Sequence, residues 1–114
     1  MAHYVYVVLS DPLPGREDDY NEWYSKQHLD DVMREVGFTA CQRFRQAEMA
    51  VPQAAPNGYL ALYEIETDDI DAVDATMRAA VGRGAVPMSD ALDLGRISAW
   101  YVEAITERRA RPPG

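Results

Sequence analysis

The residues with the clearest capacity for chemistry lie within nine positions of one predicted helix. They are Tyr20, Trp23, Tyr24 and His28. At 3.6 residues per turn, Tyr20, Tyr24 and His28 follow one another along one face, with Trp23 beside them. An imidazole can exchange a proton near neutral pH, and phenol and indole groups can donate hydrogen bonds to a bound oxygen. We therefore expect the site here, with His28 and Tyr24 as catalytic residues and Trp23 and Tyr20 as substrate contacts.

Each of these residues also has a purely structural interpretation. His28 could be a helix histidine that hydrogen-bonds a backbone carbonyl, and Trp23 could pack between helix and sheet. Tyr59 and Tyr63, on a predicted strand, could donate hydrogen bonds to a phenolate or enolate oxygen of a substrate, or could be core tyrosines. The sequence leaves these alternatives open.

Two arginines, Arg43 and Arg45, share one face of another predicted strand and need partners inside a sheet. We expect a structural ion pair with Glu64 or Glu66 on the neighbouring strand, and keep substrate binding by Arg43 as the alternative. The chain has no Gly-rich phosphate loop, zinc-ligand set or Ser/His/Asp order, so we expect neither a metal nor a cofactor.

Composition limits the classes of function. The chain has 114 residues, enough for one small domain, with a formal net charge of -8 and a pI near 4.6. This acidic balance argues against nucleic acid, because phosphate binding needs clustered basic side chains. No apolar run approaches the roughly 20 residues of a membrane span, and the single cysteine, Cys41, fits a reducing compartment. We expect a cytoplasmic protein without nucleic-acid or membrane partners.

Four predicted strands and two helical regions must position the site. The strands are expected at 3–10, 38–47, 59–66 and 96–106, and the helical regions begin near 16 and after the caps at 67–69, the second ending at Gly82. This β-α-β-β-α-β order is that of the ferredoxin-like α+β fold, a four-stranded antiparallel sheet with helices on one face. The first strand is apolar on both faces, so we expect the uncovered face to pack against an identical sheet, giving a homodimeric α/β barrel. The expected domain spans 1–107, followed by a flexible Arg/Pro tail at 108–114.

The apolar stripe of the first helical region changes direction. Tyr20, Trp23 and Tyr24 fall within roughly 100° of arc, whereas the later apolar residues cluster about 120–220° away. One straight helix cannot bury both sets against one surface. We therefore expect a break near His28, with Asp30 capping a second short helix over 31–35. His28 would then end the first helix, where the helix dipole raises the pKa of the imidazole.

Several segments together resemble one group of small bacterial proteins. They are residues 15–24 (GREDDYNEWY), His28-Leu29, Gly37-Phe38, Gln42-Arg43-Phe44, 59–65 (YLALYEI) and 88–92 (MSDAL). This pattern is similar to the EthD-like family of the dimeric α/β-barrel superfamily. The wider superfamily includes cofactor-independent polyketide cyclases, quinone-forming monooxygenases, muconolactone isomerases and haem-degrading monooxygenases. The resemblance implies a homodimer whose ligand lies in a cleft between the helices and the sheet of each protomer.

Functions from different classes remain open. In the first, His28 moves a proton next to a carbonyl or phenol of an aromatic or polyketide-like molecule, and Tyr24 or a strand tyrosine steadies the oxyanion. Cyclisation, isomerisation or dehydration fits this machinery, and cofactor-free oxygenation would also need an electron-rich substrate. In the second, the same pocket carries or sequesters a small molecule without turnover. Haem handling has less support, because an exposed histidine near acids is a poor axial ligand.

Overall fold

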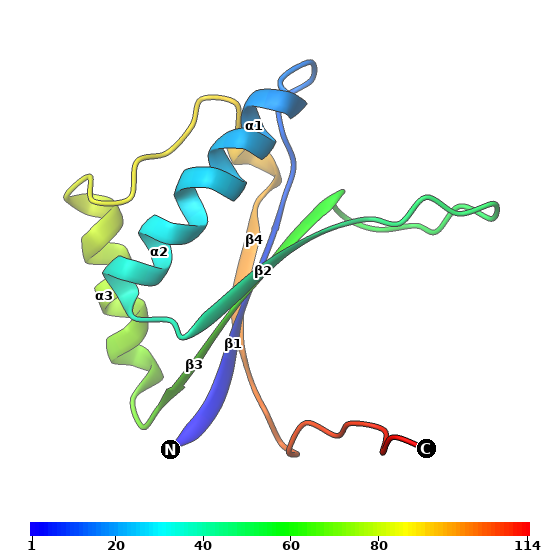
Figure 1. Cartoon of the computed structure of the whole chain (residues 1–114). Helices are drawn as coiled ribbons and strands as arrows, with labels where there is room; N and C mark the ends of the chain where they lie inside the picture. The colour runs from blue at the N-terminus through cyan, green and yellow to red at the C-terminus, as the bar shows by residue number, and fades with distance from the viewer.

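A four-stranded antiparallel sheet forms one layer of the molecule, and the helices form the other (Figure 1). The computed structural model describes all of residues 1–114. The strands, in the spatial order β2-β3-β1-β4, are β1 (Ala2–Ser10), β2 (Ala40–Arg45), β3 (Tyr59–Thr67) and β4 (Ser98–Glu103). The helices are α1 (Glu17–Trp23), the π-helical turn η1 (Tyr24–His28), α2 (Leu29–Val36), α3 (Ile70–Gly82) and the short 3₁₀ helix η2 (Leu94–Arg96). The predicted ferredoxin-like α+β fold is confirmed.

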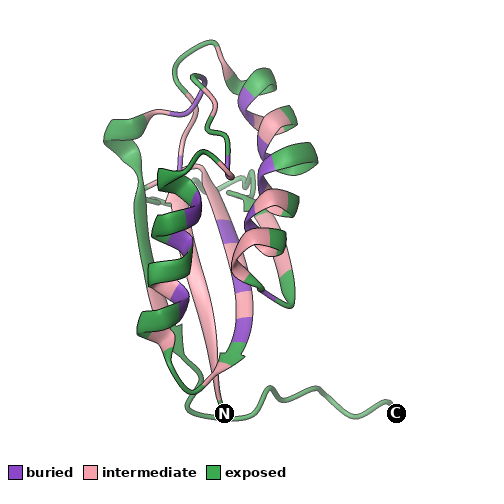
Figure 2. Cartoon of the chain, turned by 90° about the vertical axis from the view of Figure 1, so that its left-hand side faces the viewer, coloured by how far each residue is buried: buried purple, intermediate pink, exposed green.

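The core lies between the two layers because strand alternation directs aromatic side chains toward the helices. Tyr6 of β1 is in register with Tyr63 of β3 and Tyr101 of β4, and its ring stacks on that of Tyr101 at a centroid distance of 4.4 Å. The helices contribute buried side chains at helical spacing: Tyr20, Tyr24, Val32, Val73, Met77 and Ala80. Figure 2 shows that buried positions lie on the inner sides of the helices and also on the strands behind them.

The opposite face of the sheet carries no helix and is largely apolar. In its middle row, Val7 of β1 pairs with Leu62 of β3 and with Trp100 of β4. The neighbouring rows add further apolar side chains: Val5, Leu9, Phe44, Leu60 and Val102. Trp100 is 44% exposed, and only 15 of the 114 residues are buried, so one chain leaves much apolar surface on this open face uncovered.

Two segments project on the open side of the sheet. They are the loop between β2 and β3, over 46–58, and the chain after β4, over 104–114 (Figure 1). Most of their residues are exposed, including Met49, Val51 and Ile105. None of the helices combines the length and the hydrophobicity that crossing a membrane requires.

The first helical region is continuous, so the predicted break and the Asp30 cap are wrong. The backbone runs from α1 through η1 into α2, and the amide of Leu29 donates to the carbonyl of Tyr24, five residues earlier. A π turn holds one residue more than an α turn, so it rotates the following helix back by about 100°. That rotation brings Val32 and the second apolar stripe onto the sheet. The expected change in direction of the apolar stripe is present, and the π turn accommodates it without ending the helix.

Local signals explain the ends of the helices. Gly37 follows α2 with φ of 91°, a left-handed conformation that glycine adopts without strain, and its amide donates to the carbonyl of Met33 at 2.9 Å. Asp69 caps α3 by accepting a hydrogen bond from the amide of Ala72 at 3.0 Å, as the sequence predicts. Two strands are shorter than predicted: β2 starts only at Ala40, and the η2 turn delays β4 to Ser98.

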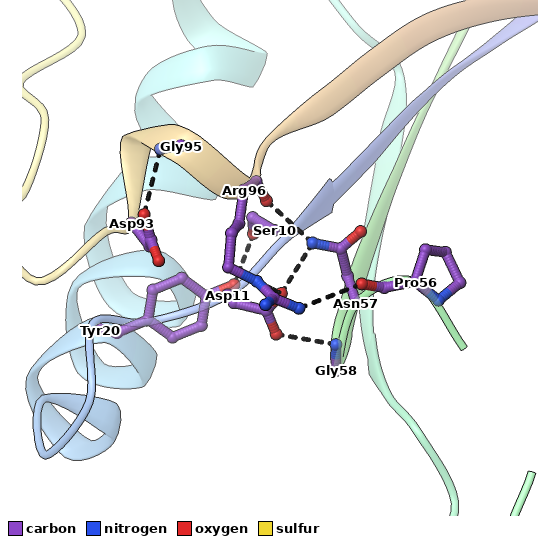
Figure 3. A network of polar contacts seen from close by, with 9 residues as sticks. All are labelled: Ser10, Asp11, Tyr20, Pro56, Asn57, Gly58, Asp93, Gly95 and Arg96. Carbon is purple, nitrogen blue, oxygen red and sulfur yellow. Dashed lines mark hydrogen bonds and ion pairs between the residues drawn. The ribbon is translucent and has the colours of Figure 1, made fainter. Parts of the chain in front are cut away.

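A polar network joins three segments at the end of β1 (Figure 3). Asp11 is its centre: Oδ1 accepts from the amide of Gly58 at 2.8 Å, and Oδ2 accepts from Asn57 Nδ2 at 2.7 Å and Arg96 Nε at 3.1 Å. Arg96 Nη2 also donates to the carbonyl of Pro56 at 3.2 Å. One carboxylate therefore ties the β2–β3 loop and η2 to β1.

We expect Asp11→Ala to lower the free energy of unfolding by about 2–3 kcal/mol, because hydrogen bonds to a charged group are lost and the amide of Gly58 is left unpaired. Urea denaturation followed by circular dichroism measures the change. Glu48→Ala is the control, since it removes a carboxylate that makes no hydrogen bond in the exposed loop, and it should change stability by at most about 0.5 kcal/mol. Equal losses in the two variants would contradict a structural role for the network.

Candidate functional site

A cavity of about 140 Å³ lies between the π turn, the sheet and α3. Its wall is mostly apolar, and the lining side chains that carry a nitrogen or oxygen atom are Tyr6, Ser10, Trp23, Tyr24, His28 and Tyr63. Such a combination of an apolar wall and a few convergent polar groups is typical of a small-molecule site.

The π turn brings three rings of this site together. Because a π turn pairs residues five apart, Trp23 and His28 come into register, and their ring centroids lie 4.4 Å apart. The ring of Tyr24 meets that of His28 edge-on, at 4.8 Å and 87°. In a regular α-helix, positions 23 and 28 would point about 140° apart. The local helix geometry is therefore what assembles the aromatic side of the cavity.

His28 is buried and electrically neutral at pH 7. Its side chain makes no hydrogen bond; Nδ1 is enclosed without a partner, whereas Nε2 is not enclosed. Burial disfavours the imidazolium and lowers the pKa of His28 to about 4, even though Asp31 acts in the opposite direction. The predicted rise of this pKa is wrong, because His28 is buried inside a continuous helical region and does not lie at a helix end.

The two tyrosine hydroxyls of the cavity are hydrogen-bond donors and poor acids. Tyr63 donates to Tyr24 across 3.4 Å, a long contact. Burial raises the pKa of Tyr24 to about 12 and also raises the pKa of Tyr63. Both phenols are therefore protonated at pH 7, and each can donate to an oxygen that acquires negative charge.

Tyr20 supports the cavity from behind. Its side chain is fully buried, its hydroxyl lies 2.5 Å from Ser10 Oγ, and its ring meets that of Tyr24 edge-on at 5.8 Å. Trp23 has its indole N–H occupied, because it donates to the carbonyl of Pro87 at 3.1 Å. This bond holds the segment before η2 over the cavity and leaves the Trp23 ring as an apolar wall.

The predicted ion pair between the β2 arginines and the β3 glutamates is wrong. Glu64 and Glu66 project from the open face of the sheet, where Glu64 contacts His3 at 3.2 Å. Arg43 is in register with the buried Ala61 and lies on the helix side, and neither Arg43 nor Arg45 has a carboxylate within 4.0 Å. The period-two alternation of the strands, combined with this register, separates the two sets of charges.

Arg43 lies beside the cavity, on the far side of the Tyr20 and Tyr24 rings. Its guanidinium carbon is 4.4 Å from the ring centroid of Tyr24, and its nitrogens donate to Ser25 Oγ at 2.8 Å and to Asn21 Oδ1 at 3.0 Å. Tyr59 borders the same place, where its hydroxyl accepts from Asn21 at 3.2 Å. These contacts define a second hollow next to the cavity.

The structure thus separates the seven residues proposed from the sequence into two groups. The cavity is lined by His28, Tyr24, Trp23 and Tyr63, whereas Arg43 and Tyr59 line the second hollow and Tyr20 lies between them. Sequence reasoning missed most of the remaining wall, which comes from distant segments: Tyr6, Val8, Ser10, Met77, Met88 and Leu92. Ser10 gave a signal as a polar residue ending an apolar strand, and Met88 and Leu92 belong to the 88–92 segment that carries the family resemblance. No group of three or more His, Cys, Asp or Glu side chains is arranged to hold a metal ion.

The fold and the cavity define a small ferredoxin-like α+β domain with a partly open cavity between its helices and its sheet. Among solved structures, the chain is similar to the crystal structure of an ethyl tert-butyl ether D (EthD) family protein from Bacillus halodurans C-125. The two are 14% identical with a TM-score of 0.60, and the match covers 92% of this chain and 100% of that chain. The predicted resemblance to EthD-like proteins is confirmed at the level of the fold. No protein-family model matches the sequence, and neither does a curated protein.

Proposed function

We propose that the chain binds a small hydrophobic molecule with a single ring in the cavity between the π turn and the sheet. The volume of about 140 Å³ carries this proposal, because an apolar cavity of roughly 150 Å³ accommodates a molecule the size of benzene. A polyketide-like ligand with several rings would need a site of roughly 300 Å³ or more. The polar groups on the wall favour a ring that bears one hydroxyl or carbonyl oxygen.

The chemistry that we propose is proton transfer by side chains of the chain itself. Neutral His28 accepts a proton at Nε2 from a carbon or hydroxyl next to the ligand's oxygen, and the hydroxyls of Tyr24 and Tyr63 donate to that oxygen as it becomes negative. The new anion then stabilises the imidazolium, which offsets the burial that lowers the pKa of His28. Isomerisation, dehydration or cyclisation can proceed through this step, and oxygenation would require a substrate that activates oxygen once deprotonated.

A second candidate function is binding without turnover. The pKa of about 4 favours it, because His28 in the unoccupied cavity is then a weak base. In this case Nε2 accepts a hydrogen bond from the ligand and only orients it, as in a carrier or accessory protein.

We also propose that the open face of the sheet packs against a second copy of the chain, forming a dimeric α/β barrel. An interface between identical surfaces must be self-complementary, and the central apolar row of Val7, Leu62 and Trp100 satisfies this condition. From strand spacing and length, the flat face offers roughly 400–600 Å², whereas a stable interface buries about 800 Å² per partner. The 46–58 loop and the 104–114 segment, which project on this side, supply the remainder. The single cysteine supports a cytoplasmic location for this dimer.

The binding proposal predicts that single-ring phenols and cyclic ketones change the fluorescence of Trp23. The Trp100→Phe variant isolates this signal, since the chain has two tryptophans. Ala99→Leu, which fills the cavity from β4, should abolish the response, whereas Ala75→Leu on the exposed side of α3 should preserve it. A response that survives Ala99→Leu, or no response to any ligand at millimolar concentration, would contradict the proposal.

Turnover separates the two candidate functions. Each ligand that binds is incubated with the chain, and exchange of carbon-bound deuterium or formation of product is followed by NMR and mass spectrometry. Exchange that depends on His28 supports proton-transfer catalysis. Tight binding without exchange in any ligand supports the carrier.

A further inference from the structure

We propose a second binding site, for the carboxylate of a small organic acid, in the hollow that contains Arg43 and Arg45. This hollow has a volume of about 330 Å³ and lies across the Tyr20 and Tyr24 rings from the cavity. Its walls come from α1, η1 and the edge of the sheet, and are formed by Asn21, Ser25, Arg43, Phe44, Arg45 and Tyr59. The site goes beyond the proposed function and does not depend on it.

Arg43 and Arg45 differ from the other arginines of the domain because they make no ion pair. Ahead of the tail, the other arginines each have a carboxylate within 4.0 Å, and they are Arg16, Arg34, Arg78, Arg83 and Arg96. The two on β2 have none, although the chain carries a net charge of -8. They point to the same side of an edge strand, roughly 6–7 Å apart along it. Two guanidinium groups therefore lie close together with no carboxylate in direct contact with either of them.

Arg43 is held in position before any ligand arrives. Its guanidinium is stacked over the ring of Tyr24 at 4.4 Å, and two of its N–H groups donate to the neutral acceptors Ser25 and Asn21. A guanidinium has five N–H donors, so three stay available for an anion. Because the guanidinium of Arg43 is already fixed in place, binding an oxyanion costs less side-chain entropy than it would at a mobile arginine.

The surroundings of the two arginines favour an aromatic carboxylate. Arg45 is exposed and can close over the second side of a carboxylate, and the ring of Tyr59 borders the hollow as an apolar surface. The carboxylate of Glu17, which accepts a hydrogen bond from the Tyr59 hydroxyl at 2.5 Å, lies at the rim. Its negative charge repels a phosphate dianion more strongly than a carboxylate with a single charge.

Titration of the full chain with benzoate tests the site, with the arginine side-chain N–H signals observed by NMR. We expect benzoate to bind at least about tenfold more tightly than neutral benzyl alcohol. Arg43→Gln or Arg45→Gln should lower the affinity for benzoate by roughly tenfold, which is the effect of losing one charge-assisted hydrogen bond. Arg45→Gln leaves every hydrogen bond of the domain intact, so its loss of binding cannot be ascribed to misfolding. Arg78→Gln, which removes an equal charge from α3, should bind benzoate like the wild type.

Two further measurements locate the benzoate site and define the class of ligand that it binds. Ala99→Leu, which fills the cavity, should leave benzoate binding unchanged, so that failure of the cavity proposal and failure of this one give different results. Loss of benzoate binding in Ala99→Leu but not in Arg43→Gln would overturn the second site. Inorganic phosphate is expected to bind more weakly than benzoate, and equal or tighter binding of phosphate would contradict the preference for a carboxylate.

Discussion

Leu62→Glu is expected to convert the proposed dimer into a monomer. Leu62 lies on the central strand β3 and is flanked in register by Val7 and Gln42 on the open face. In a symmetric interface each copy would bring one unpaired carboxylate into an apolar contact. An uncompensated buried charge costs about 3–5 kcal/mol, so the dissociation constant should rise by roughly a thousandfold or more.

Analytical ultracentrifugation at micromolar concentration measures this change. The wild type should sediment at about twice the chain mass of 12.8 kDa, and Leu62→Glu at the chain mass. Ala79→Glu adds the same charge on the exposed side of α3 and should stay dimeric. Trp100→Lys tests the same face from β4 if Leu62→Glu does not fold. A wild type that is folded and monomeric, or a dimer that tolerates both charges, would contradict the barrel.

His28→Phe is expected to remove proton transfer and to make the protein less sensitive to acid. Folding lowers the pKa of His28 from its ordinary 6.5 to about 4, so the unfolded chain binds the proton more readily. Stability that depends on the neutral ring is therefore complete above pH 6.5 and is lost as the pH falls toward 4. At pH 5 this loss amounts to about 2 kcal/mol in the wild type, and phenylalanine, which cannot titrate, avoids it.

Urea denaturation at pH 8 and pH 5 gives the comparison. His28→Phe should lose less stability between these values than the wild type, because phenylalanine does not titrate. The variant is expected to fold, since its ring can keep the contacts with Trp23 and Tyr24 and removes the unpartnered Nδ1. Identical pH dependence in His28→Phe and the wild type would show that His28 is not buried as a neutral ring. Unchanged deuterium exchange in this variant would exclude His28 as the base.

Much of the fold was predictable because its determinants are local. Alternation of Tyr4, Tyr6 and Val8 with Val5, Val7 and Leu9 indicated a strand that is apolar on both faces, and Asp69 marked the start of α3. The phase shift between the two apolar stripes of the first helical region was also visible, because it depends only on residue type and a period of 3.6. The sequence by itself thus determined the order of the elements, the face that each helix buries and the presence of Trp23, Tyr24 and His28 together in the candidate site.

Tertiary structure decided what depends on contacts between distant segments. Whether the helix breaks or passes through a π turn depends on the sheet that both stripes must meet, and the π turn continues the helix while turning Val32 inward. The direction of the pKa shift at His28 follows from the side chains that enclose it, including Met77 and Leu92 on other segments. The partners of Arg43 follow from the register of β2 against β3, which turns it toward α1 and away from Glu64. Burial, strand register and cavity volume depend on residues that are far apart in the chain. The periodicity of apolar residues within one helix or strand carries no information about them.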